Sequence, residues 1–136
     1  MKKTIAKIKD CSKCPYYRNI SLNYDLKNPK FSLELLRKGF DLSDFPEEKA
    51  ASFDTMKKLS KLTWAQIYKA PKHGLGCEKI DRNSITGDSI PDVVVDEDTT
   101  IIAFRYNGKK AMVGFREKDT FFILWFDREY KLYNHG

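Results

Sequence analysis

Long apolar runs are missing from this sequence, and so is the pattern of an export signal. No stretch approaches the ~20 apolar residues that a membrane-spanning helix requires. The N-terminal residues MKKTIAKIKDC lack the apolar core and the small-residue cleavage site of a secretory signal peptide. These absences predict a cytoplasmic protein that has no membrane partner.

Cysteine is also scarce. The chain has Cys11, Cys14 and Cys77. An odd number of cysteines in a chain without an export signal argues against a disulfide framework. The C-x-x-C spacing of the first two is that of half a zinc site, and His73 with Cys77 could complete a Cys₃His set. The alternative, which we favour, is that the thiols are free and pack near the tyrosines at 16–17. We expect no metal and no other cofactor.

The composition predicts one domain with an affinity for polyanions. The chain has 136 residues, 41% of them hydrophobic, which is enough for one core but not for two. Residues 1–20 show no clean periodicity, so we interpret them as an appendage to a single domain over 21–136. The net charge of +6 and the pI near 9.2 favour a polyanionic partner.

Two helices and one strand are expected in the first half of that domain. Alternating apolar residues predict a strand over 31–36. Ser43 and Asp44, followed by Pro46 and two glutamates, are typical of a helix start. The expected apolar positions of this helix are Phe45, Phe53, Met56 and Leu59. A second, short helix should begin at a T-x-x-Q capping box, Thr63 to Gln66, and end before Pro71.

The second half predicts a loop over 81–91 and then a three-stranded meander. The strands are expected at 101–106, 111–115 and 121–127, with Asn107-Gly108 as a two-residue hairpin turn. The segment 121–126 is apolar throughout, which predicts a central strand covered on both faces. The fold class is therefore α+β: an antiparallel sheet of about four to five strands, with two helices packed on one face.

The hairpin turn also predicts a register and a basic sheet face. The expected opposite pairs are Tyr106 with Lys109, Arg105 with Lys110, Phe104 with Ala111 and Ile102 with Val113. The last two pairs and Phe115 should face the helices, and Arg105, Lys110 and Arg116 should share the other face. Facing cations repel by about 0.2 to 1 kcal/mol unless an anion lies between them, which favours a phosphate site. Alternatively, the side chains extend into solvent or are neutralised by Asp127 or Glu129.

The C-terminal tail adds groups that could cleave RNA. Arg128 could hold a scissile phosphate, a tyrosine or histidine of the tail could take a proton from the ribose 2′-hydroxyl, and another group could return one to the leaving oxygen. His135 is more simply interpreted as a frayed terminus. His73, in the basic and glycine-containing segment KAPKHGLGCEK, could serve as a general acid or base, or could be an exposed loop residue.

The stretch FRYNGKKAMVGFREKDTFFILWFDREYKLY resembles the C-terminal meander of the RelE/ParE superfamily of toxin endoribonucleases. The preceding strand and two helices are similar to that family's order of elements. The resemblance implies phosphate-binding or catalytic roles for Arg105, Lys110 or Lys109, Arg128 and Tyr133. It also implies a bacterial toxin that cleaves mRNA without a metal, often at the ribosome, and that an acidic antitoxin neutralises. Asp127 and Glu129 flank Arg128, and a local salt bridge there would occupy it.

Two functions remain open from the sequence. An endoribonuclease needs Arg105, Lys110 and Tyr133 to converge on one concave face, with His73 as an optional fourth member. A non-catalytic nucleic-acid-binding or protein-interaction module needs only a basic face. Lys72, Tyr106, Lys109 and Arg116 are the expected RNA-binding residues, with Tyr106 stacking on bases. Burial of Tyr133 in the core would favour the module.

Overall fold

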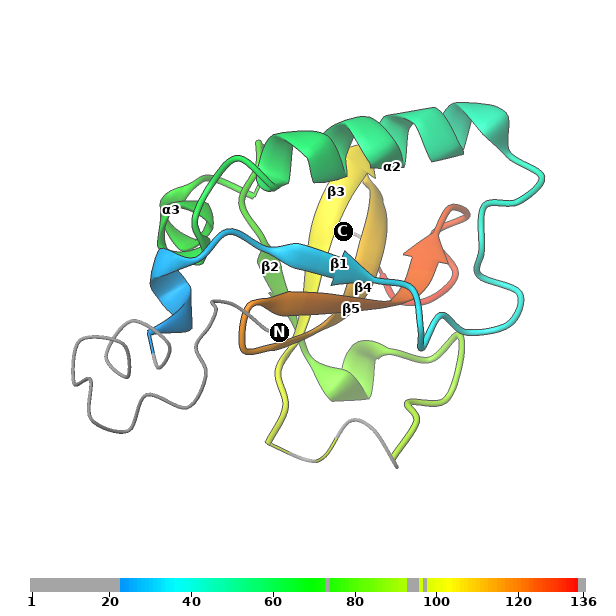
Figure 1. Ribbon diagram of the computed structural model, residues 1–136. Helices are drawn as coiled ribbons and strands as arrows, with labels where there is room; N and C mark the ends of the chain where they lie inside the picture. The colour runs from blue at the N-terminus through cyan, green and yellow to red at the C-terminus, as the bar shows by residue number, and fades with distance from the viewer. Residues whose placement is uncertain (1–22, 73, 93–95, 97, 135–136) are drawn as a thin grey trace.

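The computed structural model describes residues 23–72, 74–92, 96 and 98–134 (Figure 1). The predictions for the appendage at 1–20, for Cys11 and Cys14, and for His73 and His135 lie outside these residues. In the described part of the chain, no helix has the length and apolar character needed to cross a membrane.

The fold is α+β, as predicted, with two α-helices and a five-stranded sheet. The elements are η1 (Tyr24–Leu26), β1 (Lys30–Ser32), α2 (Pro46–Leu59), α3 (Trp64–Lys69), β2 (Glu78–Ile80), η2 (Arg82–Ser84), β3 (Ile101–Asn107), β4 (Lys110–Glu117) and β5 (Thr120–Asp127). The strand order is β1-β5-β4-β3-β2. The sheet is mixed, not wholly antiparallel, because β1 pairs in parallel with β5. Strand β1 is also shorter than the predicted 31–36, and β2 was not predicted.

Helix α2 begins where the sequence predicts, but a different face of it is buried. Pro46 is its first residue, and Glu47 and Glu48 occupy the first turn. The N-cap is Phe45, which makes no side-chain capping bond, so the prediction of a cap from Ser43 and Asp44 is wrong. Phe53, expected in the core, is 65% exposed. The buried positions are Glu48, Ser52 and Leu59, because this row of residues faces the sheet.

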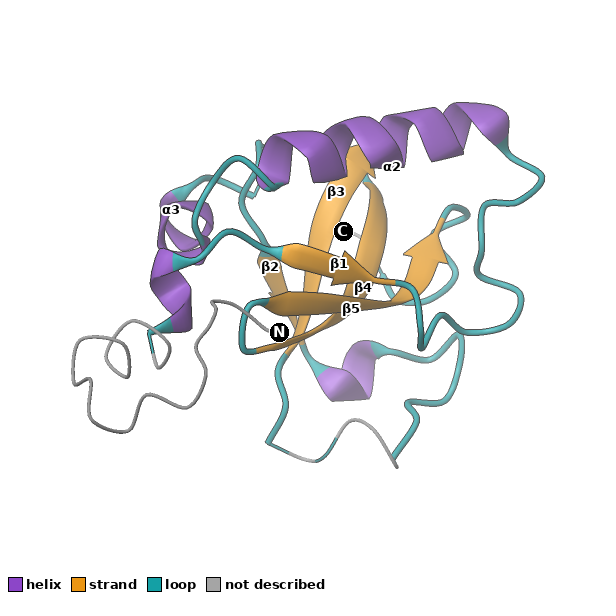
Figure 2. Cartoon of the chain, in the orientation of Figure 1, coloured by secondary structure: helices purple, strands orange, loops and turns teal. Residues whose placement is uncertain are grey.

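Helix α3 matches its prediction in detail. Thr63 is the N-cap, and its hydroxyl accepts from the backbone N–H of Gln66 while the Gln66 side chain accepts from the N–H of Thr63. The side chain of Trp64 is fully buried, and its indole N–H donates to the carbonyl of Asp119 at 3.1 Å. Figure 2 shows α2 running along one side of the sheet, with α3 next to its C-terminal end.

The hairpin register differs from the prediction. Asn107 pairs with Lys110, so Gly108 and Lys109 form the turn, and Gly108 takes the positive φ of 63°. The pairing then shifts between Arg105 and Asn107, and Arg105 faces Ala111. The other observed pairs include Phe104 with Met112, Ala103 with Val113 and Ile102 with Gly114. An extra residue at a β-bulge changes the alignment that a two-residue turn alone would set. The predicted Arg105–Lys110 pair therefore does not form.

The predicted division of the sheet into an apolar face and a basic face is also wrong. Ile102, Phe104 and Met112 pack towards Leu59 and Trp64 of the helices. Ala111, Val113 and Phe115, expected on that side, belong to a second buried cluster on the opposite face. Strand β5 is paired on both edges and buried along most of its length, which confirms the prediction for 121–127.

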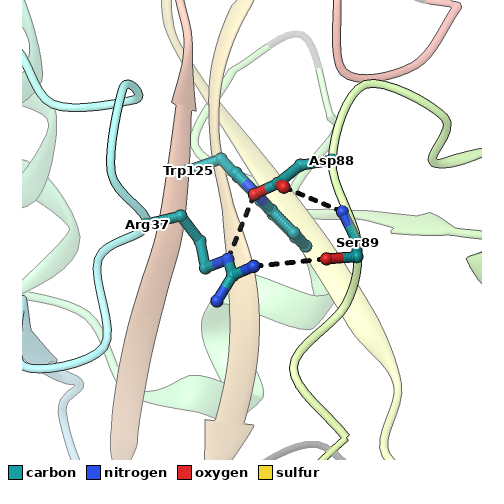
Figure 3. Close-up of polar contacts among 4 residues, drawn as sticks. All are labelled: Arg37, Asp88, Ser89 and Trp125. Carbon is teal, nitrogen blue, oxygen red and sulfur yellow. Dashed lines mark hydrogen bonds and ion pairs between the residues drawn. The ribbon is translucent and has the colours of Figure 1, made fainter.

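The second face is covered by loops and the C-terminal tail. Ile85, Leu132 and Tyr133 pack on it, together with the fully buried Trp125. Figure 3 shows how Asp88 fixes this layer: its Oδ2 accepts from the indole N–H of Trp125 at 2.9 Å and from Arg37 Nε at 3.1 Å. Arg37 also donates to the hydroxyl of Ser89 at 3.3 Å. With both faces covered, the sheet presents no open basic face in the part of the chain that the structure describes.

Candidate nucleic-acid interface

The two cations that were expected to face each other are held by two different glutamates. Arg105 Nη2 lies 3.9 Å from Oε1 of Glu78 on β2, and the Arg105 side chain is only 18% exposed. Lys110 Nζ donates to Glu48 Oε2 at 2.6 Å on the helix side, where Asn107 also donates to Glu48. The hydrogen bond from Lys110 holds the pKa of Glu48 below its ordinary value although burial opposes this. Both cations thus have carboxylate partners within the protein.

Arg116 is also occupied by contacts within the fold. Its guanidinium pairs with Asp25 at 2.8 Å and donates to the Tyr68 hydroxyl at 2.9 Å. The same group lies 4.5 Å from the centre of the Trp64 ring, within cation–π distance. Arg116 therefore holds η1 and α3 against the sheet, and its side chain is 16% exposed.

Arg128 lies over the ring of Phe45, 3.6 Å from its centre, and pairs with Glu129 at 3.2 Å. The local salt bridge that the flanking acids suggested is confirmed. Arg128 also lowers the pKa of Glu48 through its charge, which places it near Lys110 at the N-terminal end of α2.

Both tyrosines with expected roles are buried. Tyr106 is 6% exposed, so it cannot stack on bases as predicted, and its hydroxyl has no hydrogen-bond partner among the described residues. Burial, assisted by the charge of Glu48, raises the pKa of Tyr106. Tyr133 is 7% exposed, and burial together with the charges of Glu78 and Asp127 raises its pKa. A phenol with a raised pKa is a poor proton acceptor at neutral pH, and this burial is the observation that favours a binding module.

The predicted catalytic residues form two separate groups. Arg105 and Tyr133 come together beside Glu78, since the charge of Arg105 lowers the pKa of Tyr133 while that of Glu78 raises it. Lys72, an expected RNA-binding residue, joins this group at 3.8 Å from Glu78. Lys110 and Arg128 lie instead around Glu48. His73 is outside the described residues, so its place relative to either group stays a prediction.

A different set of cations is open to solvent at one end of the molecule. We call it the lysine surface: Lys57, Lys58, Lys61, Lys69, Lys72 and Lys79. All six lysines are exposed. They lie on the C-terminal end of α2, on α3, on β2 and on the loops that join these elements, which gather at the same end of the fold (Figure 1). The only acid in the interval 57–79 is Glu78.

Most of the lysine surface is unpaired. Lys58 pairs with Asp54 at 3.1 Å in an exposed i,i+4 contact, and Lys72 pairs with Glu78. Exposed pairs of this kind contribute little free energy and exchange readily with other anions. Among the residues that the structure describes, Lys57, Lys61, Lys69 and Lys79 have no carboxylate within 4.0 Å. Tyr68, 48% exposed, lies within the same surface.

The opposite sign of charge is concentrated in the next segment of the chain. Residues 81–98 contain Asp81, Asp88, Asp92, Asp96, Glu97 and Asp98, against the single cation Arg82. In Figure 1 the described part of this segment lies below the sheet, away from α2 and α3. Residues 21–136 have a net charge of only +1 (19 Lys and Arg against 18 Asp and Glu), so the cations of the lysine surface are balanced by acids elsewhere, many of them in this segment. A count of charges along the chain shows the excess of lysine over 57–79, whereas the predicted basic face of the hairpin did not include these lysines.

The zinc prediction can be followed only at Cys77. Its thiol is half-buried and forms no disulfide, and burial raises its pKa. The described residues contain no group of three side chains of the metal-binding types. The other predicted ligands, Cys11, Cys14 and His73, lie outside the described part of the chain.

Comparison with protein-family models, with curated proteins and with solved structures found no match to this chain.

Proposed function

We propose that this protein binds single-stranded RNA, without cleaving it, through the lysine surface. The observation that carries the proposal is the presence of six exposed lysines against one acid, Glu78, in the interval 57–79. The cations of the sheet, in contrast, are occupied by internal partners. This is the non-catalytic module of the two functions that the sequence left open, but on another surface of the molecule.

The physical basis is electrostatic. Each lysine that contacts a phosphate releases a condensed counterion, so the logarithm of the binding constant falls with the logarithm of salt by about 0.7 per contact for a single strand. Tyr68 supplies an exposed ring on which a base can stack. Its hydroxyl is held by Arg116, which fixes the direction of the ring. The lysine surface therefore combines phosphate contacts with one oriented aromatic ring.

The test is fluorescence anisotropy with a short labelled RNA of mixed sequence. One variant replaces Lys57, Lys61, Lys69 and Lys79 with alanine; the control variant replaces Lys38, Lys49, Lys109 and Lys131, four exposed lysines elsewhere, so that both change the net charge equally. We expect the first variant to lose affinity on the order of 100-fold at 0.1 M salt, because about four phosphate contacts are removed. Equal losses in both variants would show a nonspecific charge effect and contradict the proposal.

RNA cleavage is the second candidate, favoured by the meeting of Arg105 and Tyr133 beside Glu78. In this arrangement Arg105 would stabilise the charge on the phosphate, and Tyr133 would donate a proton to the leaving oxygen, although its raised pKa makes it a weak acid. The antitoxin, the ribosome and the bacterial toxin role remain predictions from the RelE/ParE resemblance.

Induced expression in a bacterium tests this second candidate. Growth arrest with new mRNA 5′ ends in the wild type, lost in Arg105→Ala and in Tyr133→Phe while both variants stay folded, would support cleavage. Normal growth and intact mRNA with good expression would exclude cleavage and leave RNA binding as the one proposed function.

A further inference from the structure

A hollow lies on the loop-covered side of the sheet. Its volume is about 250 Å³, and its lining includes Leu35, Phe115 and Phe122. The two phenylalanine rings are stacked, with centres 5.1 Å apart and an angle of 12° between their planes. Phe115 is 5% exposed and Phe122 is half-buried, so the two rings present a small apolar floor on which an aromatic side chain can pack.

The rim of the hollow is acidic. Asp96 and Glu117 supply two carboxylates, with Thr99 between them in the lining. The Thr99 hydroxyl donates to Asp96 at 2.9 Å and the N–H of Asp98 donates at 3.0 Å. These bonds, that of Thr99 first, lower the pKa of Asp96 and keep it ionised. The remaining charged residue of the lining, Arg116, is already paired with Asp25.

The N-terminal segment joins the described fold on the helix side of β4, where the side chain of Arg116 lies over Trp64, whereas the floor of the hollow is on the other face of the sheet. The ion pair of Asp25 with Arg116, at 2.8 Å, ties η1 to the lining, and the described chain begins at Asn23, two residues before Asp25. Tyr17 is six residues before Asn23, a span of up to about 20 Å in extended chain. A chain of this length exceeds the roughly 10 Å depth of a packed sheet layer, so the pair Tyr16-Tyr17 can reach the floor around the end of β4.

The charge of the segment complements the rim. Residues 1–20 contain the cations Lys2, Lys3, Lys7, Lys9, Lys13 and Arg18, with Asp10 as the single acid. Lys13 and Arg18 closely flank Tyr16-Tyr17, so an aromatic pair lies between two cations. The hollow has the reverse arrangement, an aromatic floor between carboxylates.

We propose that the N-terminal segment docks onto its own domain, with Tyr16-Tyr17 on the Phe115–Phe122 floor and with Lys13 and Arg18 at Asp96 and Glu117. A short tether holds the segment at a local concentration in the millimolar range, so weak contacts are enough to populate the docked state. Docking would direct the cations of residues 1–20 to the acidic side of the molecule and leave the lysine surface open. The proposal does not depend on RNA binding.

Paramagnetic relaxation in the full-length chain tests the docking. A nitroxide is attached to Cys11 in a Cys14→Ser, Cys77→Ala background, and backbone amide signals are recorded by NMR. We expect loss of the signals of Thr99, Phe115 and Glu117 in the paramagnetic sample, and their return at 0.5 M salt or in Asp96→Lys/Glu117→Lys. An Asp92→Lys variant, changed at an exposed acid outside the lining, should keep the broadening.

Two results would overturn the proposal. Signals at the hollow that keep full intensity would show that the segment does not dock there. Broadening that also appears when a nitroxide-labelled, isotopically unlabelled chain is mixed with an unmodified ¹⁵N chain would show contact between copies and not within one chain. As an independent readout without cysteine changes, Tyr16→Ala/Tyr17→Ala should shift the amide signals of Phe115 and Phe122, whereas Lys2→Ala/Lys3→Ala should leave them in place.

Discussion

The cations of the sheet and the cations of the α2–α3 end behave in opposite ways. Arg105, Lys110 and Arg116 lie on strands and are matched with Glu78, Glu48 and Asp25, respectively. The lysine surface is exposed, and most of it has no such partner among the described residues. Similar charges therefore stabilise the fold in one region and are available to a ligand in the other.

The burial of the strands explains the difference. A cation next to a covered sheet loses hydration, and this cost is offset only if a carboxylate or an aromatic ring lies beside it. Lysines at a helix end keep their hydration and need no internal partner. A strand cation is thus weak evidence for a ligand site when both faces of its sheet are buried.

The largest expected effect follows from removing the partner of a strand cation. In Glu48→Ala, the amine of Lys110 and the amide of Asn107 lose their acceptor beneath α2. Breaking such a partly buried pair should lower the free energy of unfolding by about 2 to 3 kcal/mol, measured by urea denaturation. Glu47→Ala, an exposed neighbour, should change it by no more than about 0.5 kcal/mol. Equal effects would show that Lys110 does not need Glu48.

A smaller effect is expected for Asp88→Asn. Trp125 and Arg37 both donate to Oδ2 of Asp88, and the N–H of Ser89 donates to Oδ1. An asparagine that keeps the first two bonds therefore turns its NH₂ group towards the Ser89 N–H, and in either orientation Arg37 loses a charged acceptor. We expect a loss of about 2 kcal/mol in urea denaturation and a change in Trp125 fluorescence. The matched control is Asp92→Asn, at an exposed position of the same segment, which should retain wild-type stability. A stable Asp88→Asn variant would contradict the role of Asp88 in fixing the loop layer.

The next test replaces one lysine from each region with glutamine. Lys110→Gln should lower stability by about 1 to 2 kcal/mol, since Glu48 keeps only Asn107, and should leave RNA affinity unchanged. Lys61→Gln should do the reverse. The free energy of unfolding should stay within about 0.5 kcal/mol of the wild type. The slope of the logarithm of the RNA-binding constant against the logarithm of salt should decrease in magnitude by about 0.7. If the two variants have the same profile, the distinction between the regions is wrong.

The smallest effect is a dependence of stability on pH. The pKa values of Glu48 and Asp88 are lowered in the folded protein; for Asp88, burial acts the other way but hydrogen bonds from Trp125 and Arg37 outweigh it. A lowered folded pKa contributes stability above the unfolded pKa, ordinarily 4.5 for Glu48 and 3.8 for Asp88, and that stability is lost as the pH falls through the folded value. We expect stability to fall below about pH 4.5 and the fall to be shallower in Glu48→Ala. An unchanged pH profile in that variant would contradict the assignment.

What the sequence could predict depended on how local the determining contacts are. The capping box of α3 lies within four residues, and the uninterrupted apolar sequence of β5 indicates that both of its faces are buried, so both features were predicted. The short strand β2, Glu78–Ile80, has no pattern of its own and exists because it pairs with β3. The bulge near Tyr106 likewise depends on tertiary packing, and it changed the register of the whole hairpin.

The same reasoning applies to the candidate site. The partner of Lys110 is 62 residues away in the chain, so its occupation could not be foreseen from the hairpin. The resemblance of the meander directed attention to Arg105, Lys110, Arg128 and Tyr133. The lysine surface was visible in the sequence as an excess of lysine over 57–79. Its exposure required the fold.

The most direct test of the central claim is an NMR titration of the ¹⁵N-labelled protein with a short single-stranded RNA. The account predicts that the amide shifts cluster in the described residues of 57–79, around α3 and the C-terminal end of α2, and weaken with added salt. Shifts that cluster on β3 and β4, around Arg105, Lys110 and Arg116, would contradict it and return the interface to the sheet. Absence of any shift at low salt would contradict RNA binding itself.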